Sequence, residues 1–434
     1  MDLRTKISTS RMGGYQWLIV ILCFLLNVLD GFDVLALAFT AASIREEFGL
    51  SGAEIGTLMS AGLLGMSAGS LLLAPQADRF GRRPLLIVAT ALSALGMGMS
   101  ALADSTASLG LWRVVTGLGV GGILACTNVI TSEYSSNKWR GLAISVYAAG
   151  FGIGAVLGGI SAVFLQEQYG WRAVFATGAA LTALVGVALL IWLPESVDFL
   201  MSKRPAGAKA RLNQIAAKIG MPGDWDIPAT VAHKKKAPVL QLFTERYRRS
   251  TLLIWAAFVC IMFGFYFVSS WTPALLEQAG MTKAQSQTVG MMLALGGTAG
   301  SLLFGGLTSR WPARSVLVFF CAASAAAIWL FVGLSGILAL AVLLGVLVGG
   351  LMNGCITGLY TINPTLFDAD VRSTGVGTGI GIGRLGAIAS PLIAGILLDG
   401  GWTGAQLYAG AAFVVLLAAL AVWLLGKPRK LEAV

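Results

Sequence analysis

Long apolar runs recur along the whole chain, and they constrain its fold more than any other feature of the sequence. Each is about 20 residues long, the length of helix that crosses the hydrocarbon core of a bilayer. With 56% hydrophobic and 12% charged residues, the chain has too few polar residues to cover the surface of a water-soluble fold of its length. We predict an all-α polytopic membrane protein with twelve transmembrane helices, at 15–41, 51–76, 84–103, 106–132, 141–166, 171–193, 250–276, 284–308, 314–334, 337–363, 375–398 and 402–425.

A hydrophilic stretch divides these runs six and six. It predicts an N-terminal half at 1–195, a cytoplasmic linker loop at 196–249 and a C-terminal half at 250–434. The first run is too long for a cleavable signal peptide and has no small-residue cleavage site. We therefore expect it to remain as a membrane helix.

Basic residues lie almost entirely on one predicted side of the membrane, with 25 Lys and Arg there against 3 on the other. Such a bias places both termini in the cytoplasm. The net charge of +10 therefore indicates topology and not nucleic-acid binding. The run His233–Lys236 is interpreted as a solvated face of the linker loop. The three basic residues on the opposite side are Arg45, Arg172 and Lys283.

No chemistry of an enzyme is evident in the sequence. The five cysteines all fall in apolar runs without metal-ligand spacing, which is typical of small buried residues. We find no nucleophile–base set, metal cluster or phosphate-binding loop, and so expect neither a metal nor a cofactor beyond protons. A receptor that binds a small molecule and signals is the alternative from another class, but the short linker loop is its only candidate docking surface.

Two stretches that each follow the second run of a half resemble one another. They are "APQADRFGRR" (74–83) and "GGLTSRWPAR" (305–314), at an offset of 231. Arg79 matches Arg310, Phe80 matches Trp311 and Arg83 matches Arg314. Arg140 and Arg372, each after the fourth run of its half, repeat at nearly the same offset. This pattern predicts two parallel six-helix repeats, an architecture that rocks one repeat against the other around a central site.

These features, with "DRFGRR" between the second and third runs, resemble the major facilitator superfamily. "RVVTGLGVGG" in the fourth run carries an Arg-x3-Gly-x3-Gly pattern, "GFGIGAVLGG" in the fifth carries close-packing glycines, and "PES" (194–196) closes the sixth. The chain departs from the family pattern at Ala74, where Gly is usual, and at Ser309, which stands where the first copy has Asp78. The second copy is therefore expected to form a weaker cytoplasmic clasp.

Within the superfamily, four stretches resemble the aromatic acid:proton symporters: "DGFD" (30–33), "TSEY" (131–134), "WTPALLEQAG" (271–280) and "RSTGVGTGIGIGRLG" (372–386). The resemblance implies a carrier in the bacterial inner membrane that imports benzoate-like carboxylates for aromatic hydrocarbon catabolism. It also implies acids in the first helix and arginines in the fourth and eleventh, and these positions hold Asp30, Asp33, Arg113 and Arg384.

The two acids of the first run have a physical explanation of their own. A charge at the bilayer centre costs roughly 2.5 kcal/mol or more, so such residues are kept paired, protonated or wet, and mark function. Asp30 and Asp33 share one helical face at spacing i, i+3. Asp33 and Arg113 lie at matching depth, about 10–12 Å from the outer edge at ~1.5 Å per residue, so a pair between them is possible. We predict that Asp30 and Asp33 bind the coupling proton and that Arg113 tunes it; the alternative is a static ion pair.

Arg384 lies near the predicted midplane in the other half, without a carboxylate in the membrane part of that half. A guanidinium there suits a substrate carboxylate, which it can bind bidentately; the alternative is a gate paired with Asp30. Aromatic rings at helical spacing are usually packing, yet some can enclose a flat ring, and amides can bind ring hydroxyls. The further substrate-binding candidates are Phe32, Asn128, Tyr266, Trp271, Asn353 and Tyr360.

A second set of charges lies at the predicted cytoplasmic ends of helices. The family resemblance implies that such groups latch the halves together, so we assign them to conformational switching and not to substrate. For Glu133, a simple helix-end charge is the alternative. The set consists of Asp78, Arg82, Arg83, Glu133, Arg140 and Arg372.

Together these features predict a monomeric, proton-coupled importer of small carboxylates, most of all aromatic acids, that works by alternating access in the lipid bilayer. The nearest alternatives keep the fold and change the cargo: an aliphatic dicarboxylate, a sugar acid, or a drug exported by proton antiport.

Overall fold

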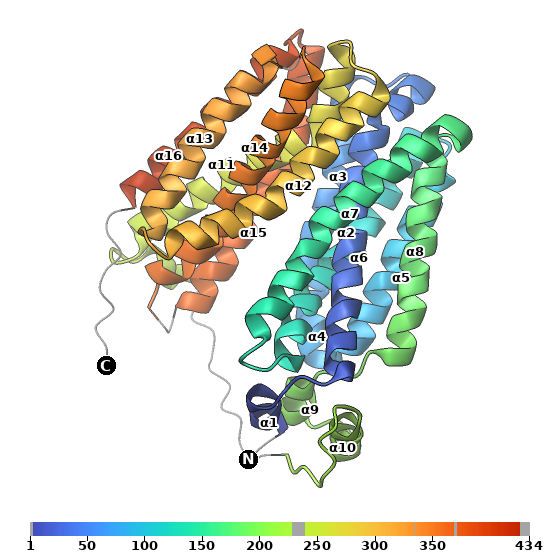
Figure 1. Cartoon of the computed structure of the whole chain (residues 1–434), viewed down its shortest axis with the longest axis vertical. Helices are drawn as coiled ribbons and strands as arrows, with labels where there is room; N and C mark the ends of the chain where they lie inside the picture. The colour runs from blue at the N-terminus through green and yellow to red at the C-terminus, as the bar shows by residue number, and fades with distance from the viewer. Residues whose placement is uncertain (1–2, 228–238, 335, 369–370, 426–434) are drawn as a thin grey trace. The chain divides into compact units, whose positions relative to one another are not determined.

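The computed structural model of the protein describes residues 3–227, 239–334, 336–368 and 371–425, and all regular structure within them is helical. Twelve of these helices are long and apolar enough to cross a membrane (Figure 1). Each overlaps one predicted run; the first continues to Phe48, and the third, Arg82–Ala101, begins and ends two residues before its predicted run. The predicted fold class is thus confirmed. The His233–Lys236 run lies outside the described residues.

The first six membrane helices include one break that the apolar pattern does not show. α3 ends at Leu72, and a short helix, α4 (Ala74–Phe80), follows with Pro75 in its first turn. Proline lacks the N–H that would continue α3, so the chain starts a new helix there. The "DRFGRR" motif is therefore divided between the end of α4 and the start of α5, with Gly81 between them. The membrane helices are α2 (Gly14–Phe48), α3 (Gly52–Leu72), α5 (Arg82–Ala101), α6 (Thr106–Tyr134), α7 (Arg140–Tyr169) and α8 (Trp171–Trp192).

The last six membrane helices follow the predicted runs closely. Two short 3₁₀ segments, η1 (Val239–Phe243) and η2 (Asn363–Leu366), lie just outside them. The membrane helices are α11 (Arg248–Gln278), α12 (Lys283–Thr308), α13 (Ala313–Leu334), α14 (Leu338–Ile362), α15 (Arg372–Asp399) and α16 (Gly404–Leu424).

Contacts group the chain into two compact units that do not coincide with the two halves of the sequence. Unit 1 takes in the described residues up to Val34, the segment Leu64–Gly158, and the chain from Leu165 to the end of the described central segment. Unit 2 takes in the helices from α11 onward together with Leu35–Leu63 and Gly159–Phe164. The second half of α2 and the first half of α3 therefore pack with the later helices.

The glycines predicted to allow close packing in α7 do so. A Cβ added at Gly154 would lie 1.8 Å from the Val28 carbonyl oxygen of α2, and one at Gly150 would lie 2.8 Å from that of Phe24. The same contact is made from the other side by Gly31, where a Cβ would lie 2.0 Å from the Phe151 carbonyl oxygen. Side chains at these positions would force α2 and α7 apart, and α2 carries the acids at 30 and 33.

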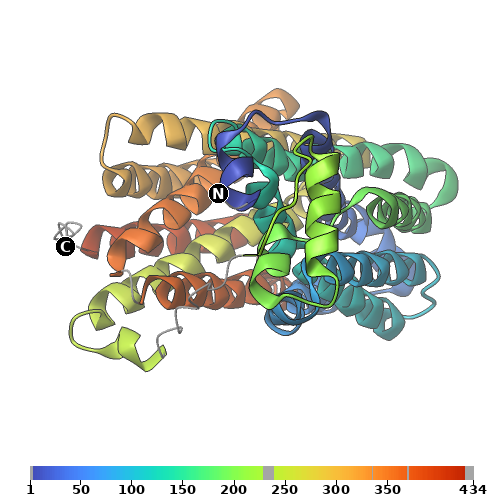
Figure 2. The same cartoon turned by 90° about the horizontal axis from the view of Figure 1, so that it is seen from below.

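Three short helices that sequence reasoning did not predict form a cap on one end of unit 1. They are α1 (Leu3–Thr9), α9 (Val197–Lys203) and α10 (Ala208–Lys218), seen together beyond the membrane helices in Figure 1 and from below in Figure 2. Their apolar faces, with Leu3 and Leu200 fully buried, continue the core of unit 1. The segment predicted as a linker loop is thus partly folded. In it, hydrogen bonds from Lys209 and Asn213 hold the pKa of Asp224 below its ordinary value.

Large apolar side chains are exposed on the sides of both units. Leu184 and Ile191 of α8 are 66% and 60% exposed, as are Leu343 of α14 and Phe413 of α16 at 64% and 61%. An apolar surface of this kind is stable only against lipid. The protein is therefore a multi-pass membrane protein.

Candidate functional site

A buried ion pair joins α2 to α6 inside unit 1. Arg113 donates to Asp33 through Nη1 to Oδ1 at 2.6 Å and through Nη2 to Oδ2 at 3.0 Å. Each residue is 3% exposed. Two parallel charge-assisted hydrogen bonds of this kind fix geometry as well as charge. The contact that the matching depths allowed is therefore present.

The surroundings of this pair are partly aromatic. The Arg113 guanidinium lies over the Phe175 ring of α8, 5.5 Å from its centroid. Such a ring offers its negative face to a cation without adding a charge. Arg113 is thus held between one carboxylate and one ring, a setting in which loss of the carboxylate charge would leave the guanidinium poorly compensated.

Asp30 lies one turn before Asp33 and is 5% exposed. On the same helix, Asn27 donates from Nδ2 to the Tyr147 carbonyl oxygen of α7 at 2.7 Å. The Tyr147 hydroxyl accepts from Thr127 Oγ1 of α6 at 3.0 Å. Buried polar contacts therefore join α2, α6 and α7 one turn from the first acid.

Sequence reasoning missed the residues of these contacts. Asn27 stands three positions before Asp30 on the same face, a spacing that was available as a signal. Tyr147 and Thr127 gave no comparable signal, because single polar residues in apolar runs are common and their facing direction is not encoded locally.

Arg384 lies half-buried in α15 within unit 2. Glycines on either side hold this part of α15 close to α11: a Cβ at Gly386 would lie 2.1 Å from the Val259 carbonyl oxygen, and one at Gly383 would lie 3.2 Å from the Phe258 side chain. The glycine-rich run around Arg384 therefore serves close helix packing and fixes where the guanidinium leaves the helix.

The other candidate substrate-binding residues differ widely in the solvent exposure of their side chains. Phe32 is 2% exposed, and its ring lies 2.8 Å from where a Cβ at Gly178 would be, so it fills space between α2 and α8. Asn128 of α6 is exposed. Tyr360 of α14 is 44% exposed and meets Phe258 edge to face at 6.1 Å.

The remaining candidates are more enclosed. Tyr266 is buried and meets Phe265 edge to face at 5.2 Å between centroids. Asn353 of α14 donates from Nδ2 to the Gly349 carbonyl oxygen at 3.2 Å. Trp271 is 2% exposed and donates from Nε1 to the Pro391 carbonyl oxygen of α15 at 3.2 Å. Only the ring faces and edges of Trp271 therefore remain for a ligand.

Trp271 lines a pocket of about 550 Å³ inside unit 2. Its wall also holds Arg45 from the end of α2 and Glu277 from the end of α11. Arg45 donates from Nε to the Leu50 carbonyl oxygen at 3.1 Å, and Glu277 accepts from Ser286 Oγ at 3.0 Å. A pocket with one cation, acids and an indole can hold a small polar aromatic molecule.

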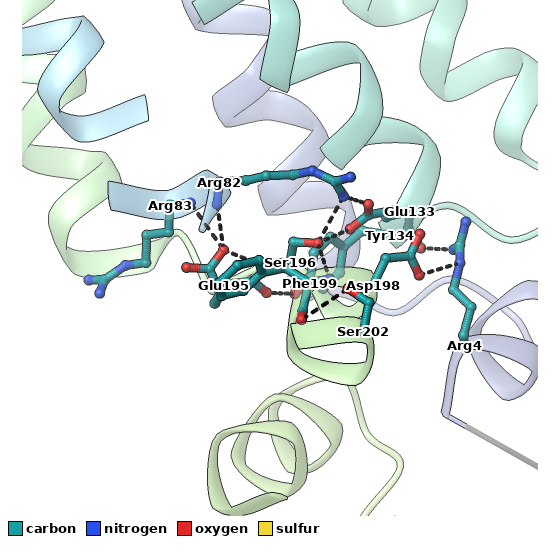
Figure 3. Close-up of polar contacts among 10 residues, drawn as sticks. All are labelled: Arg4, Arg82, Arg83, Glu133, Tyr134, Glu195, Ser196, Asp198, Phe199 and Ser202. Carbon is teal, nitrogen blue, oxygen red and sulfur yellow. Dashed lines mark hydrogen bonds and ion pairs between the residues drawn. The ribbon is translucent and has the colours of Figure 1, made fainter. Parts of the chain in front are cut away.

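A second charged cluster lies where the cap meets α5 and α6, and Figure 3 shows it. Arg82 forms an ion pair with Glu133, which is 1% exposed. Ser196 donates from Oγ to Glu133 Oε2 at 2.7 Å, and Arg82 Nη1 donates to Ser196 Oγ at 2.8 Å. Arg4 of α1 donates to the Glu133 carbonyl oxygen and pairs with Asp198 at 3.2 Å. The Glu133 carboxylate thus contacts α5 and the start of α9.

In the same cluster, the Glu195 carboxylate lies against the N-terminus of α5. Its Oε1 accepts from the backbone N–H of Arg82 at 2.9 Å, of Arg83 at 3.1 Å and of Ser196 at 2.8 Å. Gly81, with φ of +107°, leaves room for it, because a Cβ there would lie 2.4 Å from the carboxylate. A carboxylate at a helix N-terminus accepts hydrogen bonds from the free N–H groups and interacts favourably with the positive end of the helix dipole.

Of the six predicted switching residues, the structure pairs Arg82 with Glu133, whereas Arg83 joins their cluster only through its backbone N–H and donates from Nη2 to the Leu190 carbonyl oxygen at 2.7 Å. Asp78 is exposed on α4, and Arg140 begins α7. Arg372 donates from Nε to the Phe367 carbonyl oxygen at 3.3 Å in unit 2. Sequence reasoning missed the cluster members Arg4, Tyr134, Glu195, Ser196 and Asp198.

No group of three or more His, Cys, Asp or Glu that could hold a metal ion occurs among the residues that the structure describes. Twelve membrane-crossing helices with charged residues buried inside their spans define a polytopic membrane transporter. The family model of the Major Facilitator Superfamily matches residues 23–361, and the chain belongs to this superfamily.

Two curated relatives match almost the whole chain. The gallate transporter of Pseudomonas putida is 32% identical, covering 99% of this chain and 96% of its own. The 4-hydroxybenzoate transporter PcaK of Pseudomonas putida is 30% identical, covering 94% and 91%. The fold resembles the crystal structure of a D-xylose-proton symporter with a TM-score of 0.72 at 17% identity, over 96% of this chain and 99% of that one.

Proposed function

We propose that the protein imports small carboxylates of the benzoate and hydroxybenzoate type together with protons, by alternating access. The observation that carries the proton part is the buried Asp33–Arg113 pair, with Asp30 one turn away on α2. The aromatic-acid part is supported by the names of the curated relatives, which transport gallate and 4-hydroxybenzoate.

The proton is taken up by the Asp30 and Asp33 carboxylates. The described part of the chain contains no histidine, so a carboxylate is the most suitable carrier in the apolar spans. Protonation removes a buried negative charge and so lowers the cost of closing the site to water. Protonation also weakens the ion pair between Asp33 and Arg113. The packing of α2 against α6 then differs between the two protonation states.

The substrate carboxylate is bound by Arg384, since a guanidinium can hold both carboxylate oxygens at once. Of the aromatic candidates, Tyr266, Trp271 and Tyr360 remain the proposed contacts of the ring, and Asn128 and Asn353 those of its hydroxyls. The enclosed setting of Phe32 between α2 and α8 supports packing instead.

The topology belongs to the same proposal. The 25-to-3 distribution of basic residues favours cytoplasmic termini in a bacterial inner membrane. The Arg82–Glu133–Glu195 cluster then lies on the cytoplasmic side, where we assign it to conformational switching. Asp78, Arg83, Arg140 and Arg372 share that assignment. The protein is proposed to act as a monomer and without a cofactor.

The test is uptake of labelled 4-hydroxybenzoate into proteoliposomes under an imposed inward proton gradient, with gallate, benzoate, succinate and a sugar acid as unlabelled competitors. Accumulation that collapses with the gradient and is blocked by the aromatic acids is expected. Blocking by succinate or the sugar acid alone would reassign the cargo. The absence of gradient-driven accumulation would contradict proton symport.

A further inference from the structure

A groove in unit 1 lies apart from the buried charges and from the cluster of Figure 3. It has a volume of about 740 Å³ and forms where the link between α1 and α2 meets the link between α6 and α7. Arg11 lines it from the first link and Trp17 from the start of α2, while Asn137, Lys138 and Trp139 line it from the second link. Neither the transport proposal nor the cluster uses these residues.

The groove is built for an anion beside an apolar surface. Arg11 and Lys138 are both exposed, and its lining contains no carboxylate. The Lys138 ammonium lies 5.5 Å from the Trp139 ring centroid. Trp17 meets Trp139 edge to face at 6.4 Å between centroids. Two cations and two indoles thus occupy one face.

The walls of the groove are fixed by the cap and not by a ligand. The backbone N–H of Asn137 donates to the Ser8 carbonyl oxygen at 2.8 Å, which joins the two links. On the other side of α1, Leu3 and Ile7 are fully buried. A ligand would therefore pay little to order this site, which favours binding.

The groove lies at the start of two membrane helices, which is the level at which such helices meet the membrane–water interface. Its lining continues directly into α2, which begins at Gly14, and α7, which begins at Arg140. Tryptophan favours this level, where its ring meets both acyl chains and head groups.

We propose that this groove binds the phosphate of an anionic phospholipid, with Arg11 and Lys138 as its charge partners and Trp17 and Trp139 against the glycerol and upper acyl chain. A free phosphate would use the cations but would gain nothing from the indoles. Basic pockets at the ends of membrane helices bind anionic head groups in this way. With the proposed topology, the lipid belongs to the cytoplasmic leaflet.

Native mass spectrometry of the full-length protein in detergent, titrated with phosphatidylglycerol or phosphatidylcholine, tests the proposal without relying on transport. The test variant is Arg11→Gln with Lys138→Gln. The matched control is Lys6→Gln with Arg310→Gln, which removes two exposed cations that do not line the groove. Glycerol 3-phosphate as a soluble competitor separates a lipid site from a free-phosphate site.

We expect saturable binding of phosphatidylglycerol to the wild type and the control, and much weaker binding of phosphatidylcholine. The test variant should lose roughly fivefold in affinity per cation removed, the worth of one basic residue beside an anionic membrane surface. Equal binding by test variant and control, or equal binding of the two lipids, would overturn the proposal. Displacement of the lipid by glycerol 3-phosphate at matched concentration would overturn the lipid as the ligand.

Discussion

Burial decides what each single charge inside the apolar spans can do. Asp33 and Arg113 satisfy each other through two hydrogen bonds and are almost fully enclosed. Breaking one member of such a pair leaves the other as an uncompensated buried charge, which costs more than the pair itself contributes. Loss of the Asp33 carboxylate should therefore destabilise the protein, apart from the proton binding that we assign to both acids of α2.

Asp33→Asn is expected to destabilise the protein by about 3–5 kcal/mol, because the Arg113 charge stays buried beside a neutral amide. Both Asp33→Asn and Asp30→Asn should lose gradient-driven accumulation. Thermal unfolding in detergent and uptake in proteoliposomes measure the two effects. Wild-type stability of Asp33→Asn would mean that the pair is not a stabilising contact, and accumulation by both variants would remove the acids from proton coupling.

Arg384 can be tested by changing its shape without its charge. Arg384→Lys keeps the cation but loses the planar fork that holds a carboxylate bidentately. Loss of one charge-assisted hydrogen bond, worth about 1.5–3 kcal/mol, should raise the KM for the aromatic acid roughly tenfold or more. Arg310→Gln, an exposed cation at the end of α12, is the control and should leave KM unchanged. An unaltered KM in Arg384→Lys would place the substrate carboxylate elsewhere.

At the scale of elements, α5 depends on a residue far away in the sequence. Glu195 accepts from the first N–H groups of α5, and Gly81 leaves the space for it. Glu195→Ala should therefore lower stability by about 1–2 kcal/mol, the usual cost of a lost N-terminal cap. Glu195→Gln keeps a carbonyl acceptor and should cost less. The control is Glu167→Ala, which removes an exposed acid at the end of α7. If Glu195→Ala has the same thermal midpoint as this control, the cap contributes nothing to stability.

The membrane helices could be predicted from sequence because length and apolarity alone define a span. The cap helices could not, since α1, α9 and α10 have at most 11 residues and gain their stability from packing. The Asp33–Arg113 pair could be predicted, because the depth of each residue in the membrane follows from counting residues along its helix. The contact between Arg4 and Glu133 was not, because it joins positions 129 apart and depends on where the cap folds.

At the scale of the whole molecule, the grouping of contacts crosses the repeat boundary. Leu35–Leu63, from the first repeat, packs within unit 2. There Asp399 of α15 accepts from the backbone N–H of Gly52 and of Ala53 of α3, each at 2.7 Å. Ser60 donates from Oγ to the Ile388 carbonyl oxygen at 2.7 Å. These contacts, here called the α3–α15 clasp, join helices from both repeats at the start of α3 and the end of α15.

Backbones approach closely along the α3–α15 clasp, so small changes there should report on transport. A Cβ at Gly395 would lie 2.2 Å from the Gly52 carbonyl oxygen, whereas one at Gly410 of α16 meets its nearest atom at 3.9 Å. Gly395→Ala should push the two helices apart, and Gly410→Ala is the matched control.

An alternating-access carrier must form and break contacts between its repeats in every cycle. Gly395→Ala should therefore slow uptake while it speeds alkylation of a cysteine introduced at Ala42, in the pocket beside the clasp. Gly410→Ala should change neither. The two readouts move in opposite directions because the variant opens a gate without harming the buried charges. Wild-type uptake and labelling in Gly395→Ala would show that the clasp is a permanent joint of unit 2 and that the gate lies elsewhere.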